Sequence, residues 1–303
     1  MAHALATARS SLVAAARTSL TRVAATVLRF ETAAVGGISD MDVIEETTAK
    51  GVTERRVDLR VGEEIVPAMI WTPEGADGPR PTVLIGHGGT QHKQAPNVVA
   101  MARRFVRHLG YAAVATDAPG HGDRIVDPAM AELARKNLEA RLAGDTSGRL
   151  AVPDRDPEAM RAMVSRSRQG TKEWSAVLDQ LVELPEIGNG PFGYWGVSMG
   201  TSIGLPFVAA DSRITAAVLG LNGLSDRPGQ EAFGDAARSL TVPILFMFQS
   251  DDELMTRQSG LDLFDAIGSE DKAMVIHPGG HVGIPLYERD SYEAFYLRHL
   301  GPV

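Results

Sequence analysis

Ser198 lies at the centre of the run 196–200, Gly-Val-Ser-Met-Gly, which has the composition and spacing of a nucleophile held in a tight turn. Residues 192–197 before it are aromatic and β-branched and predict a buried strand, and residues 201–210 after it predict a helix. A serine between such a strand and helix has a strained backbone, so its flanking glycines avoid collisions with both elements. The sequence therefore predicts a nucleophile at the edge of a sheet.

A serine hydroxyl needs a general base to take its proton, and that base needs a third group to select its tautomer. In this arrangement the acid and then the histidine follow the serine along the chain. His281 ends the glycine-rich loop 278–281, directly after the last predicted strand, and is the predicted base. His277, at the end of that strand, is predicted to be structural, and His299, in the final predicted helix, to be a surface or packing residue.

The acid is expected after the strand 243–248, where three carboxylates stand in a row. Asp252 is the preferred candidate, because apolar residues follow it two and three positions later and anchor the turn that such an acid occupies. Asp251 is the second candidate and Glu253 the third. A charged run of this kind also occurs in ordinary solvated loops, so position along the chain decides the ranking.

Acyl transfer develops negative charge on the carbonyl oxygen, and backbone N–H groups that point to this oxygen stabilise the transition state. One donor is expected from Met199, at the positive end of the helix that follows the nucleophile. The other is expected from the loop after the strand 82–86, where two consecutive glycines allow close approach of the backbone. Gly89 is the preferred donor and Gly88 the alternative. His87, which starts this loop, is predicted to orient the turn.

The elements that position these residues follow an α/β pattern. Residues 55–61 and 65–73 predict an antiparallel hairpin, and apolar strands then alternate with helices. Near-continuous apolar strands are typical of a parallel sheet that is covered on both faces. We therefore expect a mostly parallel, eight-stranded sheet with helices on both sides. The remaining strands are expected at 82–86, 111–116, 192–197, 214–221, 243–248 and 273–276, and helices at 97–109, 201–210, 261–267 and 292–300.

A polar, helix-prone insertion at about 123–170 interrupts this alternation, with helices expected at 128–143 and 157–168. Ligands of open α/β sheets bind at the carboxyl edge, so we expect the insertion to form a lid above Ser198. A pair of helices packed on the core is the alternative. The apolar residues proposed to line the pocket are Met130, Leu133, Met160 and Met163.

The domain organisation follows from these elements. Residues 1–50 are expected to form an N-terminal helical extension, and residues 51–303 a single domain that carries the lid. The extension is alanine-rich and basic, and resembles either an amphipathic helix or an organellar transit peptide. Its longest apolar run, 12–16, is too short to cross a membrane.

Composition excludes several functions. The formal charge of the 303-residue chain is -8, which argues against nucleic acids and anionic membranes as partners. The chain has no cysteine, so disulfides, thiolate nucleophiles and cysteine metal sites are excluded. Asp117 and His121 lie in one turn without further ligands at a suitable spacing, so we expect a structural turn and no metal site. A cytoplasmic location is expected by default.

Together, the glycine loop at 87–89, the turn at 117–122, Ser198, Asp252 and His281 resemble the α/β-hydrolase superfamily. Within it, the early hairpin and the run 119–124 look most like dienelactone-hydrolase-like and acyl-peptidase-like serine esterases. A serine nucleophile sets aside the dienelactone hydrolases proper, which use cysteine, and the haloalkane dehalogenases, which use aspartate. The large propeller domain of the peptidases is absent from this chain.

The resemblance implies a serine hydrolase that cleaves carboxylic esters of small molecules through an acyl-enzyme, without a cofactor. The same three residues could hydrolyse a thioester, a lactone or a carbon–carbon bond. A different class of function is a ligand-binding protein that kept the fold and lost the chemistry. The expected residue types at every catalytic position favour an enzyme.

Overall fold

The computed structural model describes residues 40–143, 157–225 and 230–303. The sequence-based expectations for residues 1–39 and for the break at 144–156 lie outside the described residues.

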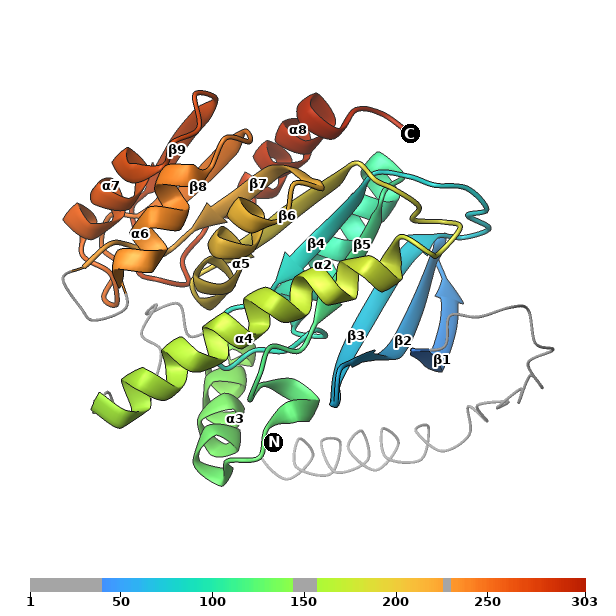
Figure 1. Ribbon diagram of the computed structural model, residues 1–303, viewed down its shortest axis with the longest axis horizontal. Helices are drawn as coiled ribbons and strands as arrows, with labels where there is room; N and C mark the ends of the chain where they lie inside the picture. The colour runs from blue at the N-terminus through green and yellow to red at the C-terminus, as the bar shows by residue number, and fades with distance from the viewer. Residues whose placement is uncertain (1–39, 144–156, 226–229) are drawn as a thin grey trace, which may run out of the picture. The chain divides into compact units, whose positions relative to one another are not determined.

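Nine strands form one sheet in the described part of the chain, in the order β1-β2-β3-β5-β4-β6-β7-β8-β9 (Figure 1). Successive pairs from β1 to β5 along this order are antiparallel, and all pairs from β5 to β9 are parallel. The strands are β1 (Met41–Ala49), β2 (Val52–Val61), β3 (Glu64–Pro73), β4 (Thr82–Gly86), β5 (Ala112–Thr116), β6 (Phe192–Val197), β7 (Ile214–Gly220), β8 (Ile244–Gln249) and β9 (Lys272–His277).

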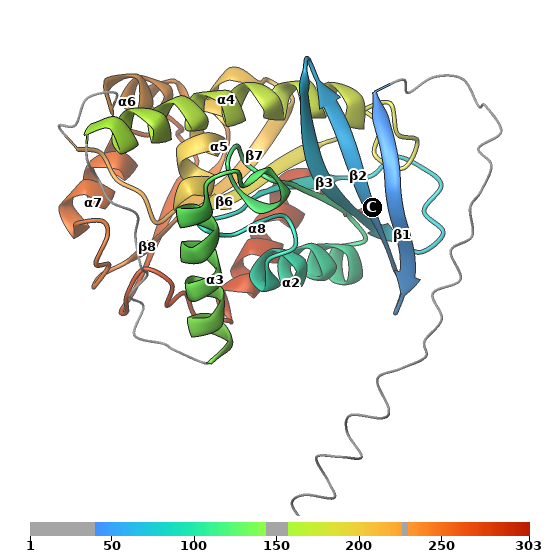
Figure 2. The ribbon, with the colours of Figure 1, turned by 90° about the horizontal axis from the view of Figure 1, so that it is seen from below.

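Helices cover both faces of this sheet. Figure 2 shows α4, α5 and α6 on one side, and α2 and α8 on the other. Each side has its own apolar core, with Phe207 of α5 buried in one and Tyr296 of α8 buried in the other. The helices are α2 (Pro96–Arg104), continued by η1 (Phe105–Leu109), then η2 (Gly122–Arg124), α3 (Pro128–Leu142), α4 (Pro157–Leu181), α5 (Met199–Ala210), α6 (Gln230–Ser239), α7 (Arg257–Ala266) and α8 (Glu288–Leu300).

The central strands β4 to β8 are buried along almost their whole length, because helices cover both faces. This burial accounts for the apolar runs seen in the sequence, and the predicted α/β fold with its antiparallel hairpin is confirmed.

The expected strand count of eight is wrong, because β1 adds a ninth strand at one edge. Its sequence, MDVIEETTA, is almost wholly exposed, and it joins the sheet only by pairing with β2. An edge strand that buries no face has no apolar alternation for a sequence reading to detect. Residues 41–49 are thus strand, although they fall in the range 1–50 assigned to a helical extension. Helix α6 was also not predicted.

The insertion contains the two expected helices, but they differ in their relation to the core. Helix α4 continues to Leu181, and its second half packs Trp174, Leu178 and Leu181 into the core beneath the sheet. Helix α3 is attached to the loop after β4, where Asn137 Nδ2 donates to Thr90 Oγ1 at 3.0 Å. Within the ranges that the structure describes, no helix combines the length and apolarity needed to cross a membrane.

Candidate active site

Ser198 occupies the turn between β6 and α5, with φ 59° and ψ -120°. Two glycines make this strained turn possible. A Cβ on Gly200 would collide with the carbonyl oxygen of Gly86 in β4, and a Cβ on Gly196 would lie 2.7 Å from the ring of Tyr194. The glycine spacing in the sequence therefore reflects how closely this turn packs on its neighbours.

Three polar side chains that the sequence analysis missed hold the turn in place. The Tyr194 hydroxyl donates to the carbonyl of Gly200 at 2.8 Å, and Asn222 Nδ2 donates to the carbonyl of Ser198 at 3.1 Å. The buried Thr201 hydroxyl contacts backbone carbonyls of both β6 and β7. No local motif signals these residues, because the roles of Asn222 and Thr201 depend on the turn and β7 lying side by side in the fold.

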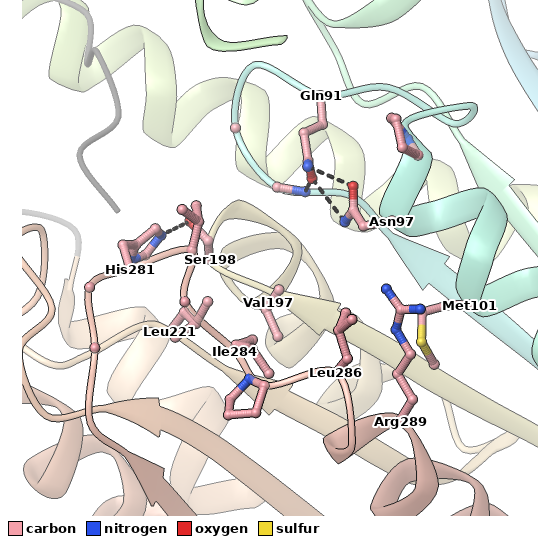
Figure 3. Close-up of a pocket in the computed structure, with 18 of the residues that line it drawn as sticks. Gln91, Asn97, Met101, Val197, Ser198, Leu221, His281, Ile284, Leu286 and Arg289 are labelled. Carbon is pink, nitrogen blue, oxygen red and sulfur yellow. Dashed lines mark hydrogen bonds between the residues drawn. The ribbon is translucent and has the colours of Figure 1, made fainter. Parts of the chain in front are cut away.

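His281 lies beside Ser198 in the loop after β9, with 2.8 Å between its Nε2 atom and the serine Oγ (Figure 3). Its Nδ1 atom lies 2.7 Å from Oδ2 of Asp252. The Asp252 side chain is 0% exposed and that of His281 is 1% exposed. Since a carboxylate only accepts, Nδ1 carries the proton and Nε2 is left to accept from the serine hydroxyl.

Asp252 is held in this orientation by its own turn. Its Oδ1 atom accepts from the N–H groups of Leu254 at 2.8 Å and Met255 at 3.0 Å. Its other oxygen is therefore left to face His281. Leu254 and Met255 are the apolar residues whose positions after Asp252 favoured a turn at this acid.

The two carboxylates next to Asp252 have other partners. Asp251 is exposed and accepts from the N–H of Gly279 at 3.2 Å, while Glu253 accepts from the backbone N–H of His281 at 2.9 Å. Both therefore brace the loop that carries the histidine, and neither bonds its ring.

Two glycines of the loop after β4 line the cavity beside Ser198, and the N–H of one of them is used within the loop. The N–H of Gly88 donates to Oε1 of the buried Gln91 at 2.9 Å, and Gln91 Nε2 donates to Oδ1 of Asn97 at 2.8 Å (Figure 3). Gly88 is thus engaged, whereas in the described residues Gly89 N–H has no hydrogen-bond acceptor. Met199 is the first residue of α5, so its N–H has no acceptor within the helix.

His87 joins two loops at the carboxyl edge of the sheet. Its Nδ1 lies 2.8 Å from the carbonyl of Gly88, and its Nε2 accepts from the N–H of Ala118 at 3.0 Å. Burial lowers the pKa of His87 to about 3, with a further lowering from nearby His121. A histidine that stays neutral, with both nitrogens engaged, matches the expected role in orienting the turn.

Asp117 is fully buried and holds the turn that begins with it. It accepts from Lys93 Nζ at 2.7 Å and from the N–H of Asp123 at 2.9 Å. A Cβ on Gly122 would collide with this carboxylate. Over the described ranges, no three side chains of His, Cys, Asp or Glu are grouped so as to hold a metal ion.

The other two candidate histidines lie away from Ser198. His277 Nε2 is 2.9 Å from Oε1 of Glu288, and His299 packs against the ring of Phe295 on α8. Neither contacts the serine.

A cavity of about 800 Å³ opens beside Ser198 and His281. This volume lies within the usual range for small-molecule sites. Leu138 and Leu142 of α3 line it, whereas Met130, Leu133 and Met163 do not, and Met163 is 47% exposed. The side chain of Met160 lies outside the described residues. The other lining residues come mainly from the loop after β4, from α2, β6 and the segment 279–292.

A scan against models of protein families and a search of curated proteins both found no match. Solved structures are similar. A cold-adapted esterase from an Arctic intertidal metagenomic library is 31% identical, with 84% of this chain and 97% of that chain covered and a TM-score of 0.64. Acetyl xylan esterase 1 from Thermoanaerobacterium is 15% identical, with 85% and 87% covered and a TM-score of 0.61. Dienelactone hydrolase from Anabaena variabilis is 20% identical, with 82% and 99% covered and a TM-score of 0.54.

The parallel sheet, with a serine turn between β6 and α5, defines the α/β-hydrolase class of proteins. With the similarity to the Arctic esterase over most of both chains, the protein belongs to the α/β-hydrolase superfamily. The resemblance predicted from its sequence motifs is confirmed.

Proposed function

We propose that the protein is a serine hydrolase that cleaves carboxylic esters of small molecules through an acyl-enzyme. The observation that carries this proposal is the pair of hydrogen bonds that links Asp252, His281 and Ser198 at 2.7 and 2.8 Å. Several of the similar structures are those of esterases, which supports an ester as the substrate.

In the first half of the proposed reaction, the Ser198 oxygen attacks the ester carbonyl while its proton passes to Nε2 of His281. Asp252 stabilises the imidazolium that forms and keeps the ring in its orientation. The proton then passes from His281 to the alcohol oxygen as the C–O bond breaks, which leaves the acyl group on Ser198.

In the second half, water loses a proton to His281 and attacks the acyl carbonyl, which releases the acid and restores Ser198. We propose that the N–H groups of Gly89 and Met199 donate to the carbonyl oxygen in both halves. Gly89 lines the cavity, Met199 directly follows Ser198, and neither N–H has an acceptor among the described residues. Gln91 positions the loop after β4 by accepting a hydrogen bond from the N–H of Gly88.

A fluorophosphonate probe is expected to label the wild-type protein at Ser198, because it reacts only with a serine that a base has activated. Mass spectrometry of the labelled peptide identifies the residue. A ligand-binding protein without chemistry would stay unlabelled.

The Gln91→Ala variant should label more slowly, by about tenfold, because Gly88 loses its partner and the donor loop loses its fixed position.

Labelling at Ser198 without hydrolysis of esters would leave an activated serine but contradict the ester assignment. Thioesters, lactones and substrates with a cleavable carbon–carbon bond would then be assayed in its place.

We propose further that α3 is the part of the insertion that borders the substrate, since Leu138 and Leu142 line the cavity. Replacing Leu138 with tryptophan should narrow the cavity and disfavour long acyl groups. The ratio of kcat/KM for an octanoyl ester to that for an acetyl ester should fall about tenfold, since each methylene in such a pocket matters by that order. Met163→Trp, on the exposed side of α4, is the matched control. An unchanged ratio for Leu138→Trp would remove α3 from the specificity site.

A further inference from the structure

Arg289 lines the cavity and has no counter-ion among the described residues. It lies in the first turn of α8 and extends towards Met101 of α2 (Figure 3). In the part of the chain that the structure describes, its guanidinium has no ion pair and no hydrogen bond. The carboxylates beside it on the helix face other bases, since Glu288 contacts His277 at 2.9 Å and Asp290 pairs with Arg104 at 2.5 Å.

The wall around Arg289 offers hydrogen-bond donors and no acidic side chain. No aspartate or glutamate is among the described residues that line the cavity. Two other lining side chains carry polar atoms that are buried without a partner, the indole Nε1 of Trp195 and the hydroxyl of Tyr292. Guanidinium and indole nitrogens can only donate hydrogen bonds. The cavity wall at Arg289 therefore presents a positive charge and hydrogen-bond donors.

The Arg289 side chain is half-buried, and a charge that is partly removed from water is stabilised by a compensating anion. The planar guanidinium fits a carboxylate through two parallel hydrogen bonds, a match that a neutral ester chain cannot offer. Because Arg289 and Ser198 line the same cavity, one ligand can reach both residues.

On the basis of the proposed function, we propose that the natural substrate is an ester with a carboxylate at its far end, and that Arg289 binds this carboxylate. Arg289 is thus the residue of the cavity that selects for a charged substrate, whereas the leucines of α3 act on the length of the acyl group. The reacting ester lies at Ser198, and the chain between the two groups lies along the apolar wall, which includes Val197, Leu221 and Ile284.

Two pairs of esters test this proposal by comparing anionic with neutral substrates of similar size. Monoethyl adipate against ethyl hexanoate places the charge on the acyl side, and 4-acetoxybutanoate against butyl acetate places it on the alcohol side. The wild-type protein should have the higher kcat/KM for the anionic member of at least one pair. Arg289→Gln should lower that anionic-to-neutral ratio about 10- to 100-fold, mainly through KM, as expected for a hydrogen-bonded charge.

Arg289→Lys should restore part of the ratio, because it keeps the charge but loses the two-pronged geometry. Arg298→Gln, at the exposed far end of the same helix, is the matched control and should leave the ratio unchanged. A wild-type protein that hydrolyses the neutral esters and disfavours both anionic ones would overturn the role of Arg289 while retaining the esterase. Hydrolysis of no ester, together with no labelling at Ser198, would overturn the proposed function itself.

Discussion

Replacing Ser198 with alanine is expected to lower kcat for a small ester such as p-nitrophenyl acetate by about 10³- to 10⁶-fold. The variant has no nucleophile to form the acyl-enzyme, although His281 and the N–H donors stay in place. Some rate above that in water should remain, because binding and the donors to the carbonyl oxygen persist. The measurement is steady-state kinetics, with thermal unfolding to show that the fold is retained.

Ser212→Ala supplies the control, because this exposed serine follows α5 at the far end of the helix from the site. It should have wild-type kinetics. Near-normal turnover by Ser198→Ala would show that the hydrolysis takes place elsewhere and would remove Ser198 from the mechanism.

Replacing Asp252 with asparagine should lower kcat by about 10⁴-fold, if the effect seen in other triads applies here. The amide nitrogen of asparagine can donate to Nδ1 of His281, which moves the ring proton to Nε2. In that tautomer Nε2 cannot accept the proton of Ser198. The side chain is 0% exposed, so solvent cannot substitute for the lost acceptor. Kinetics with the same ester, together with a melting curve, measures the effect.

Asp251→Asn is the matched control, since among the described residues the side chain of this neighbour accepts only from the N–H of Gly279, in the loop that carries the histidine. Its loss should be small, within about tenfold, because it affects loop order and leaves the imidazole tautomer unchanged. The reverse pattern, a large loss at Asp251 and a small one at Asp252, would transfer the role of the acid to Asp251.

Much of the architecture could be predicted, because burial and tight turns leave a pattern of residue types within short segments of the chain. The buried strands β4 to β8 read as apolar runs, since helices cover both of their faces. The turn at Ser198 was also visible, because its glycines are dictated by collisions within a few residues of the chain and with the adjacent strand. Strand β1 could not be predicted from the sequence, because it is stabilised by pairing with β2 and buries almost no side chain.

The candidate site likewise has features that the sequence indicates and features that only the fold reveals. Local motifs together with chain order selected Ser198, Asp252 and His281 as candidates, and the folded sheet brings their side chains within hydrogen-bond distance. Sequence could rank three adjacent acids, but only the fold shows that Asp252 faces the imidazole while Asp251 and Glu253 hold the backbone below it.

The amino-acid sequence by itself determined the residue types on which the proposed chemistry rests, because local geometry requires them. The tertiary structure alone decided which surfaces surround that chemistry. Gln91 holds the loop after β4 through the N–H of Gly88. Helix α3 lines the cavity with Leu138 and Leu142, whereas Met130 and Leu133 were expected there, and Arg289 of the last helix lines it as well. The physical reason is that these contacts join segments far apart in the chain, and no periodicity or spacing within one segment encodes which of them will meet.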